Sequence, residues 1–168
     1  MDEALVQNAG ESAPTLAPNA ERRLVRRVAA RWARLSEEHG FPAPKDLDKT
    51  EFGADWDQCF ILDLNRSAHF PFFTHLGDAV RDYCGVMLSG GEDWRCTLLT
   101  KATERAGDVA KTSAPVPVED VLTRFDGRRL AFRVILLPLC ADPDGPVTHV
   151  LGAVSGRLFE QQDFAEAS

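Results

Sequence analysis

The last third of the chain contains three strand-length segments separated by two short turn signals. The segments run over 116–125, 129–140 and 147–158, and the turns are Asp126-Gly127 and the sequence Asp-Pro-Asp-Gly-Pro at 142–146. Asp, Pro and Gly favour such turns because their backbones enter the required conformations with little strain. Connections this short join antiparallel neighbours, so the sequence predicts a three-stranded antiparallel meander.

The middle segment of this meander is apolar in both of its alternating sets of positions. One set is Ala131, Ile135 and Leu137, and the other is Phe132, Val134 and Leu136. We therefore expect this strand to be central and covered on both faces. Arg133 is the charge within it, and burying an unpaired guanidinium is costly. It should pair with a neighbour such as Asp63, reach a sheet edge, or bind an anionic ligand.

Two more strand signals precede the meander. Apolar and aromatic runs at 56–64 and 69–76 predict two strands in hairpin order. The segment 41–55 contains two prolines, a glycine and several aspartates, which predicts an ordered connector leading into the first strand.

Two helix signals lie between these strands and the meander. Residues 78–84 predict a helix of about two turns, ended by Gly85. Residues 92–106 predict a second helix, with acidic residues at its start and Gly107 at its end. Helices that follow one another here would cover one face of the sheet.

The amino-terminal part divides into a leader and an amphipathic helix. Residues 1–18 lack periodicity and predict a disordered leader, and 19–40 predict a helix. Its apolar stripe is Leu24, Val28, Trp32 and Leu35, and a basic flank follows it at Arg23, Arg27, Arg31 and Arg34. We expect the stripe to form a homodimer or partner interface, while the helix covers part of the second face of the sheet. Residues 41–159 then form the main domain, and 160–168 form a carboxy-terminal tail.

The charge is unevenly distributed. Six arginines and one glutamate give residues 19–35 a charge of +5, whereas the whole chain carries -7, which leaves -12 for the remainder. An acidic body repels nucleic acid, so a nucleic-acid partner is not expected. The basic helix flank could contact an acidic partner, although a solvated flank is the commoner meaning of such a row.

The sequence lacks the signals of secretion, membrane insertion and metal binding. No basic and apolar leader and no apolar run of about 20 residues occur, so we expect a cytoplasmic protein without a membrane span. The four cysteines, Cys59, Cys84, Cys96 and Cys140, form no CxxC pair and have no histidine at ligand spacing. Reduced, mostly buried thiols and no metal site are therefore expected.

The order of two strands, helices and a three-stranded meander resembles a PAS domain, and in particular a bacterial PAS-like family of small, mostly single-domain proteins. The resemblance covers about 23–158 and rests on Trp32 with Gly40-Phe41-Pro42, Trp56 with Cys59-Phe60-Ile61-Leu62-Asp63, His75-Leu76-Gly77 with Tyr83-Cys84-Gly85, and Leu136-Leu137-Pro138-Leu139. It implies an α+β fold, with helices on one face of a five-stranded antiparallel sheet. It also implies a sensory or protein-interaction module, commonly dimeric, that acts on other proteins in signal transduction.

The resemblance raises haem and flavin as cofactors, and the residues disfavour both. The segment 92–106, which supplies the haem histidine in many haem-binding PAS domains, contains no histidine. The cysteine Cys84 lies in Tyr-Cys-Gly-Val rather than in the Asn-Cys-Arg-Phe motif of the light-sensing relatives that form a flavin adduct. The strand histidines His69 and His75 are then expected to be ordinary hydrogen-bonded side chains.

A small-molecule site between the sheet and the helices is the main alternative to a pure interaction module. Its candidate lining residues are His75, Tyr83, Trp94 and Arg133. His75 or Arg133 would be the polar anchor of an anionic or aromatic ligand. For Arg133, pairing within the protein is the favoured interpretation.

Catalysis has no candidate residues of comparable quality. The sequence contains no Ser-His-Asp elbow, phosphate loop, HExxH motif or carboxylate pair at a recognisable spacing. The segment 89–94, Ser-Gly-Gly-Glu-Asp-Trp, superficially resembles the GGDEF hairpin of diguanylate cyclases, but it is better explained as the start of an acid-capped helix. A nucleotide-processing enzyme that uses Glu92 and Asp93 is therefore the weakest hypothesis, and a non-enzymatic regulator acting on signalling proteins is the first.

Overall fold

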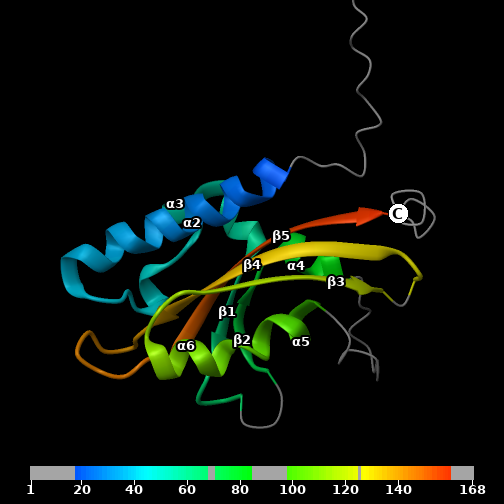
Figure 1. Cartoon of the computed structure of the whole chain (residues 1–168). Helices are drawn as coiled ribbons and strands as arrows, with labels where there is room; N and C mark the ends of the chain where they lie inside the picture. Colours follow the sequence, from blue (N-terminus) through cyan, green and yellow to red (C-terminus); the bar gives the residue numbers. More distant parts are fainter. Residues whose placement is uncertain (1–17, 68–70, 85–97, 125, 160–168) are drawn as a thin grey trace, which may run out of the picture.

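The computed structural model describes residues 18–67, 71–84, 98–124 and 126–159. A five-stranded antiparallel sheet forms the middle layer, with α2 on one face and α4, α5 and α6 on the other (Figure 1). We call these the outer face and the inner face. The elements are α2 (Pro18–His39), η3 (Pro44–Asp46), α3 (Lys49–Phe52), η4 (Gly53–Gln58), β1 (Cys59–Asp63), β2 (Phe73–Leu76), α4 (Asp78–Cys84), α5 (Leu98–Thr103), α6 (Ala106–Thr112), β3 (Val116–Thr123), β4 (Arg129–Leu139) and β5 (His149–Phe159).

The strands lie in the order β2-β1-β5-β4-β3, and every neighbouring pair is antiparallel. The predicted meander of the last three strands is confirmed, as is the α+β class. The centre of the sheet is β5 rather than β4, because β1 pairs with the free edge of β5. The strand β4 still lies inside the sheet, between β5 and β3.

The first two strands are shorter than the sequence predicts. Within 56–64, only Cys59–Asp63 is a strand, because Gly53–Gln58 forms a 3-10 helix. Within 69–76, the strand is Phe73–Leu76, and residues 68–70 lie outside the described part. The aromatic side chain of Trp56 strengthened the strand signal, but this side chain stacks on Phe52 from within the 3-10 helix.

The helices on the inner face follow the prediction at α4 and depart from it further on. The predicted helix, expected to end at Gly107, ends earlier, at Thr103, and a separate helix, α6, begins at Ala106 and includes Gly107. A glycine costs a helix only about 1 kcal/mol, and the buried neighbours Ala106 and Val109 hold this turn against the sheet. Residues 92–97 of the predicted helix lie outside the described part. No helix among the described residues is both long and apolar enough to span a membrane.

The inner face is closed by close packing that requires a glycine at position 152, and a second close approach occurs at Gly77, between β2 and α4. A Cβ at Gly152 would overlap the ring of Phe60 on the neighbouring strand, and a Cβ at Gly77 would overlap the backbone carbonyl of Asp57. The cluster around Phe60 is continuous from β1 to β3 and includes Leu98 and Val109 of the covering helices. Such packing leaves no room for an added methyl group at either glycine.

Candidate functional site

The apolar stripe of α2 packs onto the outer face of its own sheet. Leu24, Val28 and Trp32 are only 4%, 1% and 8% exposed, and Leu35 packs at the margin of the same cluster. The indole Nε1 of Trp32 donates a hydrogen bond to the carbonyl oxygen of Pro138 at 2.9 Å. The predicted use of this stripe as a dimer contact is therefore corrected, because these side chains already form the core of a single chain.

The basic flank of α2 is largely committed to ion pairs within the chain. The guanidinium of Arg27 donates two hydrogen bonds to the Asp55 carboxylate, at 2.9 and 2.8 Å, and this pairing raises the pKa of Arg27. Arg34 pairs with Glu51 at 2.9 Å, and Arg31 donates to the Glu51 carbonyl oxygen. Three of the four predicted basic-patch residues thus fasten α2 to α3 and η4. The fourth, Arg23, is exposed and forms no ion pair with the described residues.

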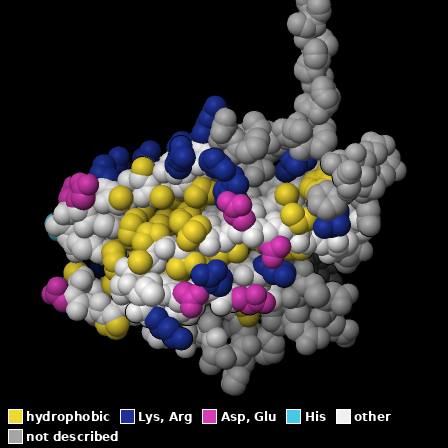
Figure 2. All heavy atoms as spheres, in the orientation of Figure 1, with side chains coloured by type: hydrophobic (Ala, Val, Ile, Leu, Met, Phe, Trp, Pro, Cys, Tyr) yellow, Lys and Arg dark blue, Asp and Glu magenta, His cyan; other side chains and the backbone are white. Residues whose placement is uncertain are grey.

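The helix α2 contacts β5 and β4 and leaves the outer face beyond them open. That open area carries a strip of exposed or partly exposed apolar residues, which we call the outer strip and which consists of Pro117, Val121, Ala131 and Ile135. In the register, Val121 opposes Ala131 and Pro117 opposes Ile135, and opposed residues share a face. Because Ile135 packs against the α2 cluster, the strip lies on the outer face. Hydrophobic side chains gather there between α2 and β4 (Figure 2).

An ion pair lies in the middle of the outer strip. The Nε of Arg133 donates to the Glu119 carboxylate at 2.7 Å, where the Arg133 side chain is 16% exposed and that of Glu119 is 61% exposed. This hydrogen bond is the main cause of a lowered pKa of Glu119, and the charge of Arg22 on α2 contributes to it. The prediction that Arg133 pairs within the protein is confirmed, with Glu119 as a partner instead of Asp63.

His75 also lies on the outer face, because it opposes Ile61 of the α2 cluster. Its ring stacks on Trp56 with centroids 4.0 Å apart, and its Nε2 donates to the Trp56 carbonyl oxygen at 3.2 Å. Burial is the main cause of a lowered pKa of His75. The ring is thus held by stacking and hydrogen bonding, as expected for an ordinary structural histidine.

Tyr83 lies on the opposite side of the sheet, in α4. Its hydroxyl group lies 3.4 Å from the amide of Gln58, and its ring covers Gly156. Trp94, like His69, lies outside the described residues. The structure does not bring the predicted lining residues of a single ligand site together: His75 and Arg133 are on the outer face with two strands between them, and Tyr83 is on the inner face. Alternation along one strand predicts which residues of that strand share a face. It does not predict whether residues of distant elements lie on the same face of the sheet.

One polar cluster in the structure has no signal in the sequence. His149 Nε2 lies 3.5 Å from the Asp63 carboxylate, and the Thr148 hydroxyl lies 2.8 Å from His149 Nδ1. The hydroxyl, imidazole and carboxylate are the groups of a nucleophilic triad, but the Thr148 hydroxyl also accepts a hydrogen bond from the backbone N–H of Ala141. This cluster therefore ties the β4–β5 hairpin to the end of β1. The Asp and His are far apart in sequence and gave no signal.

The three cysteines in the described part are unpaired and buried, as predicted. Burial raises the pKa of Cys84 to about 11, and it raises the pKa of Cys59 as well. A thiol with a raised pKa is a weak nucleophile near neutral pH. Cys96 and the acidic residues Glu92 and Asp93 lie outside the described residues.

Comparison with known proteins identifies the fold. A family model described as a PAS domain matches residues 21–155. Among solved structures, a light-oxygen-voltage domain studied with a flavin analogue is 21% identical, covers 65% of this chain and 81% of its own, and has a TM-score of 0.43. A LOV protein of Rhodobacter sphaeroides is 14% identical, with 66% and 68% covered and a TM-score of 0.42. The light state of the Aureochrome1 LOV photoreceptor is 16% identical, with 66% and 87% covered and a TM-score of 0.43.

No curated protein sequence matches the chain. The solved structures are too distant in sequence to carry a ligand or a light response over to this chain. The expectation that haem and flavin are disfavoured therefore stays a prediction. The same holds for the homodimer and for the absence of catalysis.

Proposed function

The chain belongs to the PAS domain family, and from this premise we propose that it is a regulator that works as a homodimer through the open part of its outer face. PAS domains are sensory modules of signal transduction and are generally not catalysts. The homodimer would then present a surface to signalling proteins.

A single observation carries this proposal: the outer strip is an open apolar area next to a helix that stops short of it, with the Arg133–Glu119 ion pair between its two ends. Its members Val121, Ala131 and Ile135 are partly exposed on adjacent strands. Contiguous apolar residues rimmed by charges are typical of interaction surfaces. The strip is the part of the outer face that α2 would cover if it lay one strand further across.

The charges around the strip favour a second copy of the same chain as the occupant. Two exposed arginines, Arg22 and Arg26, lie along its α2 border. They are on the side of α2 away from the ion pairs with Asp55 and Glu51. Within the strip lies the exposed carboxylate of Glu119, which pairs with Arg133. A two-fold axis through the strip would bring the arginines of each copy toward Glu119 of the other, so the surface is self-complementary.

The substitution Val121→Glu tests the proposal on the full chain. A carboxylate in the centre of a desolvated contact is expected to weaken the dimer by ~30-fold or more. Folding should change little because Val121 lies on an edge strand with its side chain partly in solvent. Light scattering coupled to size-exclusion chromatography over a dilution series measures the dissociation constant.

Ala110→Glu is the matched control, because Ala110 is exposed on α6 at the inner face. It should leave self-association unchanged. A wild-type chain that stays monomeric at every concentration, or a dimer that Val121→Glu and Ala110→Glu affect equally, contradicts the proposal.

A further inference from the structure

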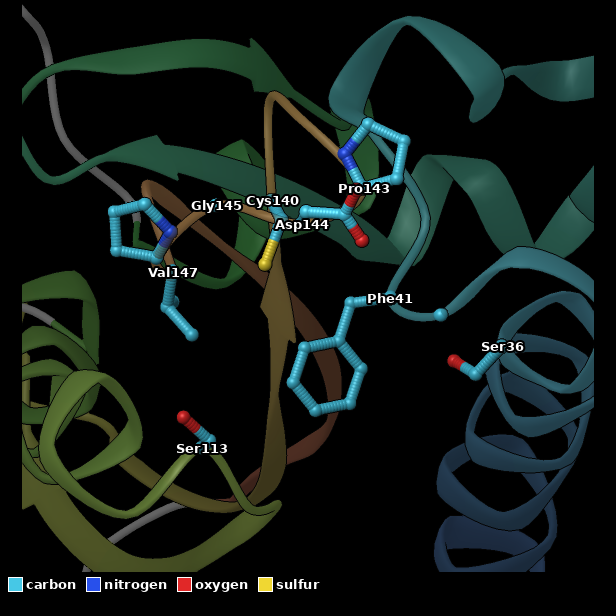
Figure 3. Close-up of a pocket in the computed structure, with 10 residues that line it drawn as sticks. Ser36, Phe41, Ser113, Cys140, Pro143, Asp144, Gly145 and Val147 are labelled. Atoms are coloured by element: carbon cyan, nitrogen blue, oxygen red, sulfur yellow. The ribbon is translucent and has the colours of Figure 1, made fainter.

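A pocket of about 350 Å³ lies at one end of the sheet, apart from the outer strip and from the inner face. Three segments that are distant in sequence surround it: the carboxy-terminal end of α2 with the turn that follows, the residue after α6, and the β4–β5 hairpin. The lining residues are Ser36, Gly40, Phe41, Ser113, Cys140, Pro143, Asp144, Gly145, Pro146 and Val147. Several of their side chains, including Phe41, Val147 and Ser113, surround a common hollow (Figure 3).

The walls of the pocket are held in place by contacts outside it. The ring of Phe41 stacks on Trp32 with centroids 5.5 Å apart, and the backbone N–H of Cys140 donates to the Pro42 carbonyl oxygen at 3.1 Å. The hairpin is fixed by the Thr148 and His149 cluster described above. Ser113 closes α6 in the left-handed conformation with φ of 53°, and its backbone N–H donates to the Val109 carbonyl oxygen at 2.8 Å. The hollow is therefore preformed rather than a gap between mobile loops.

The chemistry of the lining selects among ligands. Phe41, Val147, Pro143 and Pro146 offer an apolar surface with one aromatic face, and the Cys140 sulfur suits contact with a ring edge. The polar groups include the Ser113 hydroxyl and the Asp144 carboxylate, and no lysine, arginine or histidine lines the pocket. The chain as a whole carries a charge of -7. Anionic ligands are thus opposed both locally and globally, whereas a cation has a partner.

We propose that this pocket binds a small primary amine that carries one aromatic ring. The ring would lie against Phe41 and Val147, and the ammonium group would face the Asp144 carboxylate. A volume of about 350 Å³ is at the small end for ligand sites, which suits a single ring with a short chain. The pocket is a second site, independent of the dimer contact, and it is separate from the space between the sheet and α4–α6.

The probes are 2-phenylethylamine, its neutral analogue 2-phenylethanol and its anionic analogue 3-phenylpropanoate, each titrated into ¹⁵N-labelled full-length protein. Amide shifts of pocket residues such as Phe41, Ser113 and Val147 report the site and the affinity. The amine should bind ~5-fold more tightly than the alcohol, the difference expected of a partly exposed ion pair. The carboxylate should bind most weakly.

Two substitutions separate the pocket from non-specific binding. Val147→Trp fills the hollow and should abolish binding, and Asp144→Asn should reduce amine affinity to that of the alcohol. Asp82→Asn, on the exposed surface of α4, is the charge-matched control and should have no effect. If Val147→Trp does not fold, Asp144→Asn with the three analogues still decides the matter, since Asp144 is exposed.

The proposal is overturned by any of three results: no pocket shifts with the amine up to ~10 mM, equal affinity for amine and alcohol, or amine binding that survives Val147→Trp. It also fails if Asp144→Asn and Asp82→Asn weaken binding equally. None of these results depends on whether the chain dimerises.

Discussion

The two faces of the sheet are built differently, although both are covered by helices. On the inner face, α4, α5 and α6 close over one continuous apolar cluster from β1 to β3. On the outer face, α2 lies over β5 and part of β4, and one of its flanks is fixed by ion pairs. The inner face is thus core along its described length, while the outer face is half core and half surface.

The difference teaches how one helix can serve both stability and recognition. The stripe of α2 provides buried area, its flank at Arg27, Arg31 and Arg34 fixes its position, and its other flank at Arg22 and Arg26 borders the open strip. Burial contributes far more free energy than exposed ion pairs do. The ion pairs therefore orient the helix, while burial of the stripe stabilises its attachment to the sheet. An open apolar area remains on the outer face because α2 lies over β5 and β4 and not over β3.

The largest expected effect comes from removing the side chain that anchors α2. Trp32→Ala deletes a buried ring and its hydrogen bond to Pro138, and should lower the free energy of unfolding by about 3–5 kcal/mol. Denaturation followed by circular dichroism measures it. Trp32→Phe keeps most of the volume and should cost less than half as much. If Trp32→Ala and Trp32→Phe lower the free energy of unfolding by the same amount, the side chain of Trp32 is not part of a tightly packed core on the outer face.

A slightly smaller effect is expected from overfilling the inner face. Gly152→Val places a side chain where the Phe60 ring lies, and should destabilise the protein by about 2–3 kcal/mol because the packed cluster resists expansion. Gly107→Ala, exposed in α6 with open space around its Cβ position, is the matched control and should stabilise by up to about 1 kcal/mol. Thermal unfolding compares the pair, and a tolerated Gly152→Val would mean that the inner face has spare room.

The ion pairs that orient α2 should contribute still less to the free energy of unfolding. A double-mutant cycle with Arg27→Met and Asp55→Asn is expected to give a coupling energy of about 0.5–1 kcal/mol, which decreases as salt is added. Arg26→Met, whose parent forms no ion pair in the described part, should show no coupling to Asp55→Asn. Coupling that persists in high salt would indicate a more buried pair than the exposed geometry implies.

The smallest effect concerns pH and the outer face beside β2. The pKa of His75 is lowered in the folded chain, chiefly by burial, so the unfolded chain binds the proton more readily. Its contribution to stability is therefore full above the unfolded pKa of about 6.5 and is lost as the pH falls through the lower folded pKa. His75→Gln should flatten this part of the stability profile. Parallel profiles for His75→Gln and wild type would contradict the assignment.

Much of the fold could be predicted from the sequence, and much less of the candidate site. The turn residues at 126–127 and 142–146 determined the meander, and the periodicity of Leu24, Val28 and Trp32 determined an amphipathic helix that begins and ends within a residue of its predicted bounds. These signals are local, because turn chemistry and helical spacing act over a few residues. The helix predicted to end at Gly107 ends instead at Thr103, and Gly107 lies in the first turn of a second helix whose Ala106 and Val109 are buried in the inner cluster.

What only the tertiary structure decided is which surface each residue faces and which distant residue it meets. The sequence by itself determined that Arg133 needs a partner, but the β3–β4 register supplied Glu119. It marked the α2 stripe as apolar, but the position of α2 over β5 and β4 made that stripe core and left Val121 and Ala131 open. The pocket near Phe41 likewise joins three segments that are far apart in sequence. Periodicity determines on which side of a helix or strand a residue lies. Which distant residues it contacts depends on how the helices and strands pack together.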